Sequence, residues 1–285
     1  MVEIAYARPE EREDVAQFMV KVFPRAKWDI TGWRKLLAGR WNGPDGRYAI
    51  IVRDKGEIVG CLGLVIADRL TSQGPKTIAD MSSWYVLKEY RAQGVGRDMI
   101  ALALSDPKVT IVNFASAKAA VNVLVNAGLT VLDEDRFVWR PTGNAAPFLV
   151  HDQPLDLGDR LIAKDRKVLE DHQGLRLRPV AVETPDGLCV VVMYPQKKHD
   201  EYVTLESMYV GDQGLFARHA RGIADSILSA SGEILTLDRR LGANGIESDG
   251  IEPLGVPRFY REGLIEKADI DMLYSECILL NVKIH

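Results

Sequence analysis

The sequence predicts an α/β protein with a mixed (α+β) sheet and two domains. Its 285 residues fit two cores of about 140 residues better than one large core. Hydrophobic residues make up 47% of the chain and the mean hydropathy is −0.07, so a core can be buried and general disorder is excluded. Strands alternate with helices only in the later part of the first half, which indicates a mixed sheet rather than an all-parallel one.

Hydrophobic periodicity and turn residues define the elements of the first half. Acidic residues follow Pro9, and apolar residues then recur at helical spacing, which predicts a helix. Residues 42–46 and Asp54–Gly56 predict turns, and the polar residues of Arg69–Lys76 predict a connection between strands. The expected elements are a strand at Glu3–Ala7, helices from Pro9 and at Thr31–Leu37, strands at Tyr48–Arg53, Glu57–Ala67 and Thr77–Val86, a helix from Gly96–Asp98 to Leu104, a strand at Val109–Phe114, a helix at Lys118–Asn126 and a strand at Leu129–Trp139.

The second half is expected to repeat the middle of the first half in worn form. Residues 141–154 contain three prolines, so 141–158 is the expected linker between a domain at 1–140 and a domain at 159–285. The expected elements are a helix at Asp159–His172, strands at Leu188–Tyr194 and Tyr202–Val210, a helix at Leu215–Leu228, a strand at Ile234–Asp238, a short helix at Pro257–Glu262 and a final strand at Met272–Val282.

Composition and charge exclude several classes of function. The net charge of −4, without a basic stripe that carries aromatic residues, argues against a nucleic-acid partner. No apolar run reaches the ~18 residues of a membrane span, and the first residues lack a signal peptide, so we expect a cytoplasmic protein with no membrane contact. Cys61, Cys189 and Cys277 are expected to be buried thiols, and the five histidines show no metal-ligand spacing, so no metal is expected. We expect a monomer with two similar halves or a homodimer.

The segment from Asp80 to Arg97 carries the strongest functional signal. A strand runs through a glycine-containing loop into a helix, and such a loop can direct several backbone N–H groups toward one point. The first helical turn adds its unpaired N–H groups and the positive end of the helix dipole. This arrangement suits a phosphate or pyrophosphate, and Arg91 and Arg97 flank it. The alternative is that Gly94 and Gly96 only begin the helix tightly.

The residues Arg91–Gly96 (Arg-Ala-Gln-Gly-Val-Gly) resemble the Arg/Gln-x-x-Gly-x-Gly/Ala signature of the GNAT superfamily of acyl-CoA-dependent acyltransferases. The preceding Val86–Arg91 resembles the Val-x-x-x-Tyr-Arg lead-in of the family, and 114–129 resembles its later helix, which ends in Gly-Phe. The resemblance covers residues 1–140 well and 175–285 in worn form. It implies a GNAT-like fold, with two tandem GNAT-like domains and no cofactor site in the second, where Val210–Leu215 lacks the signature.

The resemblance also implies that acyl-CoA, with acetyl-CoA as the first choice, is the co-substrate. Backbone N–H groups from Arg91 to Arg97 would hold its pyrophosphate. The strand Asp80–Val86 would carry a bulge and diverge from Val109–Phe114, which would open a slot for the pantetheine arm. A backbone N–H at that point would stabilise the oxyanion. The expected cofactor-binding residues are Trp84, Val86, Arg91, Ala92, Gln93, Gly94, Val95, Gly96, Arg97, Asn113 and Ser116.

Acyl transfer to an amine needs a base that removes a proton from the nucleophile. Asp80 is the expected base, because it stands eleven residues before Arg91, where histone acetyltransferases of this superfamily carry a catalytic glutamate. Burial would raise its pKa, which suits a base. Period-two alternation places Asp80, Ser82 and Trp84 on one strand face, and Ser82 is expected to hydrogen-bond the substrate or a water. The alternatives are a carboxylate that caps a loop or pairs with an arginine, and a hydroxyl that fills the strand.

The leaving thiolate needs a proton, and here the sequence departs from the family pattern. Leu124 stands where many family members carry a tyrosine that acts as the acid, and Leu129 replaces the phenylalanine. The acid is then water, Tyr85 or Ser116, or there is none.

Two functions remain open. One is an N-acyltransferase, chiefly an N-acetyltransferase, that acts by direct attack of an amine of a small molecule or peptide. The other is a GNAT-like module that binds CoA or an acyl chain, or serves assembly. The acceptor is an amino sugar, amino acid, polyamine or peptide. Trp28, Trp33 and Trp41 either stack on a sugar ring or pack in the core.

Overall fold

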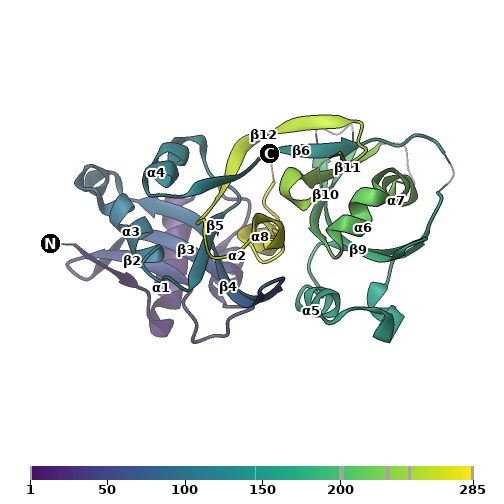
Figure 1. Cartoon of the computed structure of the whole chain (residues 1–285). Coiled ribbons are helices and arrows are strands. Elements are labelled where there is room, and N and C mark those ends of the chain that lie inside the picture. The colour runs from purple at the N-terminus through teal and green to yellow at the C-terminus, as the bar shows by residue number, and fades with distance from the viewer. Residues whose placement is uncertain (1, 145, 199–201, 229–231, 243–244, 284–285) are drawn as a thin grey trace. The chain divides into compact units, whose positions relative to one another are not determined.

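The computed structural model describes residues 2–144, 146–198, 202–228, 232–242 and 245–283 (Figure 1). The chain divides into two compact units. Unit 1 contains residues 1–132, 256–269 and 274–284, and unit 2 contains residues 133–255 and 270–273. These units differ from the expected domains, 1–140 and 159–285, because most residues after 255 pack within unit 1. The domain limits and the linker at 141–158 stay a prediction.

Unit 1 is built on a mixed sheet, as the sequence predicts. Its strands, in order across the sheet, are β1 (Glu3–Tyr6), β2 (Ala49–Asp54), β3 (Glu57–Thr71), β4 (Gly74–Val86), β5 (Val109–Asn113) and the end of β12 (Gly250–Tyr260). Neighbouring strands are antiparallel except β4 and β5, which are parallel. A parallel pair needs a long connection, which here contains a helix, and the turn into that helix lies at the end of β4.

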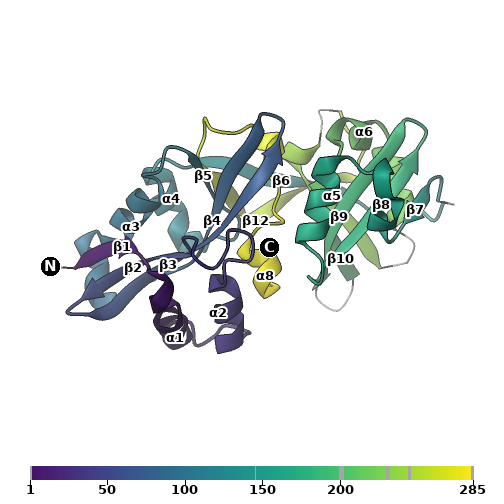
Figure 2. The ribbon, with the colours of Figure 1, turned by 90° about the horizontal axis from the view of Figure 1, so that it is seen from below.

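Helices cover both faces of this sheet (Figure 2). One face carries η1 (Pro9–Glu11), α1 (Arg12–Val22), α2 (Ile30–Leu37) and α8 (Glu276–Leu280), and the other carries α3 (Val95–Ala103), η3 (Lys118–Ala120) and α4 (Val121–Asn126). The apolar stripe of α1 packs with Cys61 and Val65 of β3, whereas Met99 and Ile100 of α3 pack with Met81 of β4. Because successive strand residues point to opposite faces, the same strands serve both cores.

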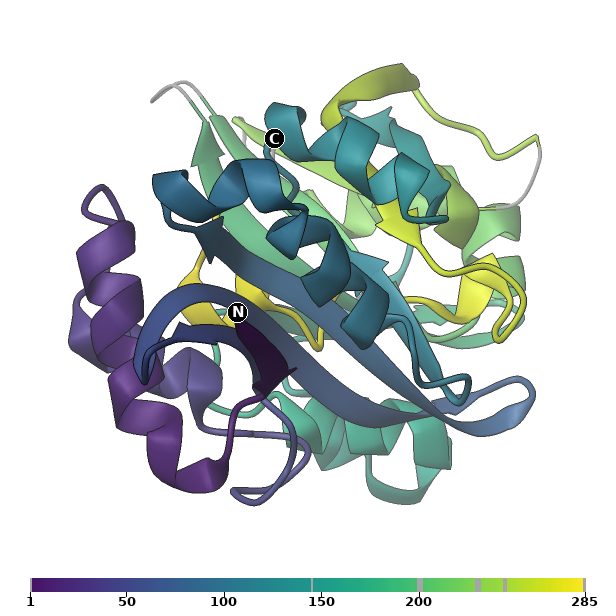
Figure 3. The ribbon, with the colours of Figure 1, turned by 90° about the vertical axis from the view of Figure 1, so that its left-hand side faces the viewer.

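The hairpin of β3 and β4 is longer than the sequence suggests (Figure 3). The expected connection at Arg69–Lys76 is wrong, because the strands stay paired until Thr71 faces Gly74. The polar residues have partners across the pair: the Thr77 hydroxyl donates to Asp68 at 2.6 Å, and the Thr71 hydroxyl donates to the Gly74 carbonyl at 2.7 Å. Polar side chains here satisfy each other within a strand pair and do not mark a loop.

Unit 2 repeats the topology of unit 1. Its strands, in order across the sheet, are the end of β6 (Thr130–Trp139), β11 (Glu233–Asp238), β10 (Tyr202–Val210), β9 (Gly187–Lys198), β8 (Arg178–Thr184) and β7 (Leu149–His151). Only β10 and β11 are parallel. Its helices are η4 (Pro154–Arg160), α5 (Ala163–Asp171), α6 (Gln213–Arg218), α7 (Ala220–Ile227) and η5 (Arg239–Leu241). The order of pairing along β7–β11 equals that along β1–β5, as the expected repeat requires.

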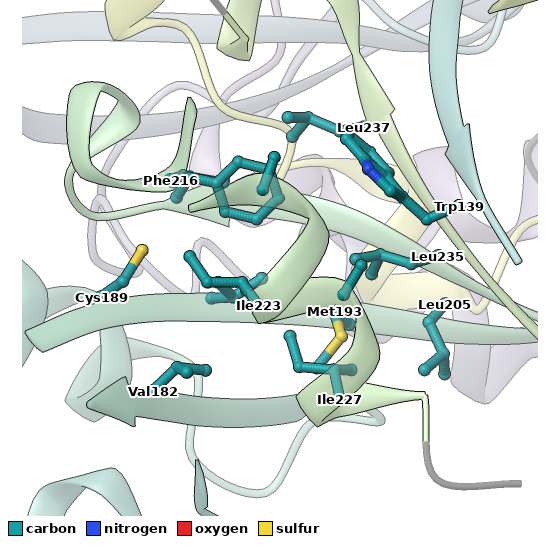
Figure 4. Packing of buried hydrophobic residues seen from close by; sticks show 14 of the residues in the cluster. Trp139, Val182, Cys189, Met193, Leu205, Phe216, Ile223, Ile227, Leu235 and Leu237 are labelled. Carbon is teal, nitrogen blue, oxygen red and sulfur yellow. The ribbon is translucent and has the colours of Figure 1, made fainter. Parts of the chain in front are cut away.

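The core of unit 2 is packed between its sheet and α6–α7. Figure 4 shows Phe216, Ile223 and Ile227 of these helices beside residues of β8, β9 and β11. Trp139 at the end of β6 is fully buried there, and its ring contacts that of Phe216 edge to face, with centroids 5.7 Å apart. This unit therefore has a core of its own.

Each unit is completed by a strand end from the other half of the sequence. Trp139, at the end of the first half, pairs with Leu235 of β11 in unit 2. Phe259, near the end of the chain, pairs with Asn113 of β5 in unit 1. The sheet of unit 1 thus includes residues that the sequence analysis assigned to the second domain.

The last part of the chain differs from the sequence expectations. The short helix expected at Pro257–Glu262 is wrong, because residues 257–260 belong to strand β12, where Phe259 and Tyr260 pair with β5. The strand expected at Met272–Val282 is wrong too, because α8 forms there after Ser275 and ends at Asn281, whose φ of 52° is left-handed. Short apolar runs fit a helix and a strand equally well by periodicity alone. The short 3-10 helices η2 (Lys88–Gln93) and η6 (Lys267–Asp269) complete the list of elements in unit 1.

Candidate active site

The candidate site lies where the pairing of β4 and β5 ends. The two strands pair in parallel from Thr77–Val109 to Asp80–Val112 and no further. At the next position the Asn113 side chain donates to the Met81 carbonyl at 2.7 Å, in place of a backbone hydrogen bond. The predicted divergence of these strands is therefore confirmed.

A β-bulge lies on β4 at the same point. The pairing with β3 passes from Cys61–Tyr85 to Gly63–Ser82, so β4 has one extra residue there. Ser83 takes up the irregularity with a φ of 45°, which is rare for a residue with a Cβ. The bulge expected on this strand is confirmed.

The bulge reverses which residues share a face of β4. The expectation that Trp84 lies on the face of Asp80 and Ser82 is wrong, because the extra residue shifts the alternation by one position. Trp84 packs in the core of α3 and α4 with Met81. Tyr85 packs on the opposite face against Phe23, with ring centroids 5.5 Å apart.

A cavity of about 620 Å³ passes through the sheet at the bulge. From one face it is lined by Phe23, Trp28 and Trp33, and from the other face by Ile100 and Leu124. Its middle is formed by Ser82, Ser83 and Trp84 of β4 and by Asn113 and Ser116 after β5. A molecule that enters this cavity can thus extend from one layer of helices to the other.

A second hollow of about 490 Å³ adjoins the first, because both are lined by Trp84, Ala117 and Ala120. The residues that line the second hollow include Tyr85, Val86, Arg91, Gly94, Gly96 and Arg97. The structure therefore brings most of the predicted cofactor-binding residues to one continuous surface. The exceptions are Gln93 and Val95, which do not line either hollow, while the side chain of Ala92 lies outside the described part of the structure.

The glycine segment supplies the geometry of an anion site. Gly94 has a φ of 77° and caps α3, so the N–H groups of the first turn point away from the helix body. The Gly96 position is close to Trp84: a Cβ there would lie 2.6 Å from the indole ring. A side chain at this position would therefore collide with Trp84.

The arginines flank this segment in different ways. Arg91 donates from Nε to the Val86 carbonyl at 2.8 Å, and its guanidinium lies over the Tyr85 ring at 5.0 Å. Arg97 is exposed and contacts its neighbour Asp98 at 3.3 Å, so its guanidinium can turn toward a ligand. Exposed ion pairs of this kind contribute little to stability and are easily exchanged. Gln93 is exposed as well and bonds the Glu89 carbonyl at 3.2 Å.

Three buried polar atoms in the cavity wall lack a partner among the described residues: Ser82 Oγ, Trp28 Nε1 and Trp84 Nε1. Buried polar groups are nearly always hydrogen-bonded, so these atoms indicate that the cavity holds polar groups of a ligand or water. Two N–H donors and one hydroxyl suit carbonyl and amide oxygens, which are the groups of an acylated pantetheine arm.

Asp80 is buried beneath the cavity and does not line it. It is 1% exposed, and its Oδ2 accepts the backbone N–H of Glu276 at 3.1 Å. Burial raises the pKa of Asp80 to about 7, although the N–H groups of Glu276 and Phe114 and the charge of Arg69 act in the opposite direction. The rise in pKa agrees with the expected base, but its position does not give it contact with the cavity.

Glu276 was missed by the sequence analysis. It lies at the start of α8, is 8% exposed and lines the cavity, and its Oε2 accepts the Ser83 hydroxyl at 3.2 Å. Burial raises its pKa to about 8, and the charge of Asp80 adds to the rise. The sequence does hold a signal, because Glu276 is the only charged residue in the apolar run Met272–Val282.

The structure places the expected proton donors for the leaving thiolate in different hollows. Leu124 is buried in the cavity wall and offers no proton, and Tyr85 lines only the second hollow. Ser116 lies in the cavity wall, and its hydroxyl donates to Asn113 Oδ1. Ser82 and Ser83 also line the cavity and carry hydroxyl groups.

Trp28 and Trp33 line one end of the cavity and contact each other, with ring centroids 5.2 Å apart. Trp41 instead contacts Tyr274 at 5.1 Å and is not part of the wall. All three cysteines are buried and free, as predicted. Within the described residues, none of the helices has the length and apolar character needed to cross a membrane.

Residues 11–108 match the family described as acetyltransferase (GNAT) family. No curated protein matches the chain. Among solved structures the chain is similar to a GCN5-related N-acetyltransferase from Anabaena variabilis ATCC 29413, with 10% identity and a TM-score of 0.58 over 91% of this chain and 72% of that one. A probable N-acyltransferase from Enterococcus faecalis V583 gives 11% identity and a TM-score of 0.58 over 94% and 73%. Eis1 from Mycobacterium abscessus gives 12% identity and a TM-score of 0.51 over 92% and 73%. At identities this low, the TM-scores show a shared fold and no more. The aligned part of the chain includes both units.

Proposed function

We propose, from the match of residues 11–108 to the acetyltransferase (GNAT) family, that the protein transfers an acyl group from acyl-CoA to an amine. The main support is the cavity that passes through the sheet at the β4 bulge. Through the adjoining hollow it connects the glycine segment at the start of α3 with the buried carboxyl group of Glu276, whose backbone N–H donates to Asp80. This arrangement suits a donor with a phosphate group at one end and a reactive carbonyl at the other.

The residues present fit acyl-CoA. The first-turn N–H groups after Gly94, together with Arg91 and Arg97, would hold the pyrophosphate. The pantetheine arm would run past Trp84 between β4 and β5, where the strands no longer pair with each other. The unpartnered Trp84 Nε1 and Ser82 Oγ offer hydrogen bonds to amide and thioester oxygens along that path.

The chemistry we propose is direct attack of a neutral amine on the thioester carbonyl. Backbone N–H groups at the bulge would stabilise the oxygen that becomes negative, in a site with little water. A buried carboxyl group with a raised pKa would take the proton of the amine. Leu124 stands in the wall where the family pattern has a tyrosine, so the departing sulfur would receive a proton that the amine itself gives up.

The acceptor end of the cavity suggests the class of amine. Phe23, Trp28 and Trp33 form an aromatic wall, and Glu276 lies on the same cavity. We therefore propose an amine attached to a flat or apolar group, from a small molecule or the end of a peptide. Trp28 Nε1 adds a donor for one polar group on that acceptor.

The test is release of free CoA thiol from acetyl-CoA with a panel of amines, which should include aromatic amines, amino sugars, amino acids and polyamines. We expect turnover with at least one aromatic or apolar amine. Binding of CoA is measured separately by a thermal shift, because a ligand that binds the folded state raises Tm. Absence of both turnover and a shift in Tm would contradict the proposal.

One observation favours the alternative function. Leu124 occupies the place of the expected acid, and a module that only binds acyl-CoA needs no acid. A clear rise in Tm with CoA, without thiol release for any amine in the panel, would support this alternative over the enzyme.

A further inference from the structure

We propose that Glu276 accepts the proton of the acceptor amine and that Asp80 is its positioning residue, so that the C-terminal helix α8 supplies the base. This inference rests on the acyl transfer proposed above. It replaces the expectation that Asp80 itself is the base. The two carboxyl groups differ in whether they line the cavity and in the groups to which they are hydrogen-bonded.

The two carboxyl groups have different surroundings. Glu276 lines the cavity at the bulge, where the Ser83 hydroxyl donates to its Oε2 at 3.2 Å. Asp80 lies beneath the cavity and accepts the backbone N–H of Glu276 at 3.1 Å. That bond fixes the first turn of α8 on β4, and through it the starting point of the Glu276 side chain. Glu276 is therefore placed to contact a bound amine, and Asp80 is placed to hold Glu276.

A second side chain in the cavity wall, that of Ser82, also indicates a ligand next to Glu276. The Ser82 hydroxyl is 2% exposed, lines the same cavity and has no partner among the described residues. It is the neighbour of Ser83, which holds Glu276. A polar group bound next to Glu276 would give Ser82 the hydrogen bond that it lacks.

The charges around the pair suit proton transfer near neutral pH. Burial raises the pKa of Glu276 to about 8 and that of Asp80 to about 7, and each negative charge opposes the other. Arg69 acts on Asp80 in the opposite direction, and beside them Cys277 has a raised pKa and is influenced by Arg258. Two coupled carboxyl groups of this kind share about one proton near neutral pH. A base whose pKa lies near the working pH is well matched to an ammonium group.

Acyl transfer begins with a proton transfer from the acceptor. The ammonium group of the acceptor gives one proton to the Glu276 carboxylate, which becomes a carboxylic acid. The freed nitrogen lone pair forms the N–C bond, and the carbonyl π electrons move to oxygen. The carbonyl then re-forms as the C–S bond breaks, and its electrons leave on sulfur. The nitrogen loses a second proton, which ends on the sulfur as CoA thiol, and Glu276 returns its proton to water.

The test compares three variants by steady-state kinetics over a range of pH. Glu276→Gln is expected to lower kcat by about 100-fold or more, the usual effect of losing a general base, with CoA affinity within about twofold of wild type. Glu276→Asp should restore part of kcat. Asp80→Asn should lower kcat less than Glu276→Gln does and should move the acidic limb of kcat/KM to lower pH, because removing the neighbouring charge lowers the pKa of Glu276. A merely structural Asp80 would not move that limb.

A matched control is available in unit 2. Asp165 is a buried carboxyl group with a raised pKa that accepts the Tyr209 hydroxyl at 2.5 Å. Asp165→Asn should change neither kcat nor the pH profile. A fully active Glu276→Gln, or loss of turnover in Asp80→Asn with an active Glu276→Gln, would overturn the inference and leave the acyl transfer standing. A wild-type protein that binds CoA but acylates no amine would overturn both.

Discussion

The two units share one order of strands but differ where their middle strand ends. In unit 1, β4 ends at Val86, and the 3-10 helix η2 and Gly94 lead into the nine residues of α3. In unit 2, β10 ends at Val210, and only residues 211 and 212 precede α6. There the carboxylate of Asp212 accepts the N–H of Leu215 at 2.8 Å. The helix start in unit 2 is thus already occupied by a negative group of its own chain.

The glycines of the two segments serve different purposes. Gly94 adopts a φ of 77°, which allows the chain to turn before α3. Gly211 allows close packing, because a Cβ there would lie 2.6 Å from Asp165 Oδ1. The comparison teaches that the shared fold does not by itself make an anion site. The proposed anion site depends on the segment 88–94, which has no counterpart between β10 and α6.

The largest effect is expected from a negative charge at Gly94. Gly94→Glu is expected to weaken CoA binding by about 100-fold or more, because it places a negative charge at the anion site and strains a left-handed residue. Isothermal titration measures the affinity, and the wild type should bind one CoA per chain.

Gly143→Glu is the control for that prediction. Gly143 lies in unit 2, also has a φ of 77° and is exposed with open space around it. Its substitution carries the same backbone strain and the same charge, but CoA affinity should not change. Equal losses in the two variants would mean that the anion site lies elsewhere.

A second comparison concerns one buried glutamate in each unit. Glu206 of unit 2 pairs with Arg136 at 3.0 Å and accepts the Thr236 hydroxyl at 2.9 Å. Glu206→Gln should lower the free energy of unfolding by about 3 kcal/mol, because Arg136 loses its buried partner. Glu276→Gln should cost about 0 kcal/mol or stabilise, because it removes a buried charge that faces Asp80. Urea unfolding followed by circular dichroism measures both, and a large loss for Glu276→Gln would mean that this side chain holds the fold together.

The smallest expected effect belongs to Asp212. Asp212→Ala removes the cap of α6 and should lower the free energy of unfolding by about 1 kcal/mol. It should not create a second CoA site, because residues equivalent to 88–94 are still missing. Titration with CoA checks the number of sites, and a value of two per chain would contradict the role given to the loop.

The local parts of the site could be predicted from the sequence. The segment from Val86 to Gly96 combines a strand end, a left-handed glycine and a helix start, and all of these depend on neighbouring residues. The position of Asn113 beside β4 also followed from the order of elements. The fold class and the repeated topology were predictable for the same reason.

The remaining parts depend on contacts between distant residues. Glu276 contacts Asp80 across 196 positions of sequence, and no local pattern states that contact. The bulge at Ser83 moved Trp84 to the opposite face from Asp80, because one extra residue reverses all later alternation. The apolar run around α8 fits either a strand or a helix, and packing in unit 1 decides between them.

The end of β6 belongs to unit 2 and the end of β12 to unit 1, and this has a consequence for biosynthesis. A ribosome releases the glycine segment and the bulge of β4 long before it has made β12 and α8, which belong to the same compact unit. The early chain can form its helices and hairpins, but β5 has no β12 beside it and the cavity has no Glu276. A chain terminated before α8 would thus lack the proposed base, so a helix translated after unit 2 would determine when unit 1 can act as proposed.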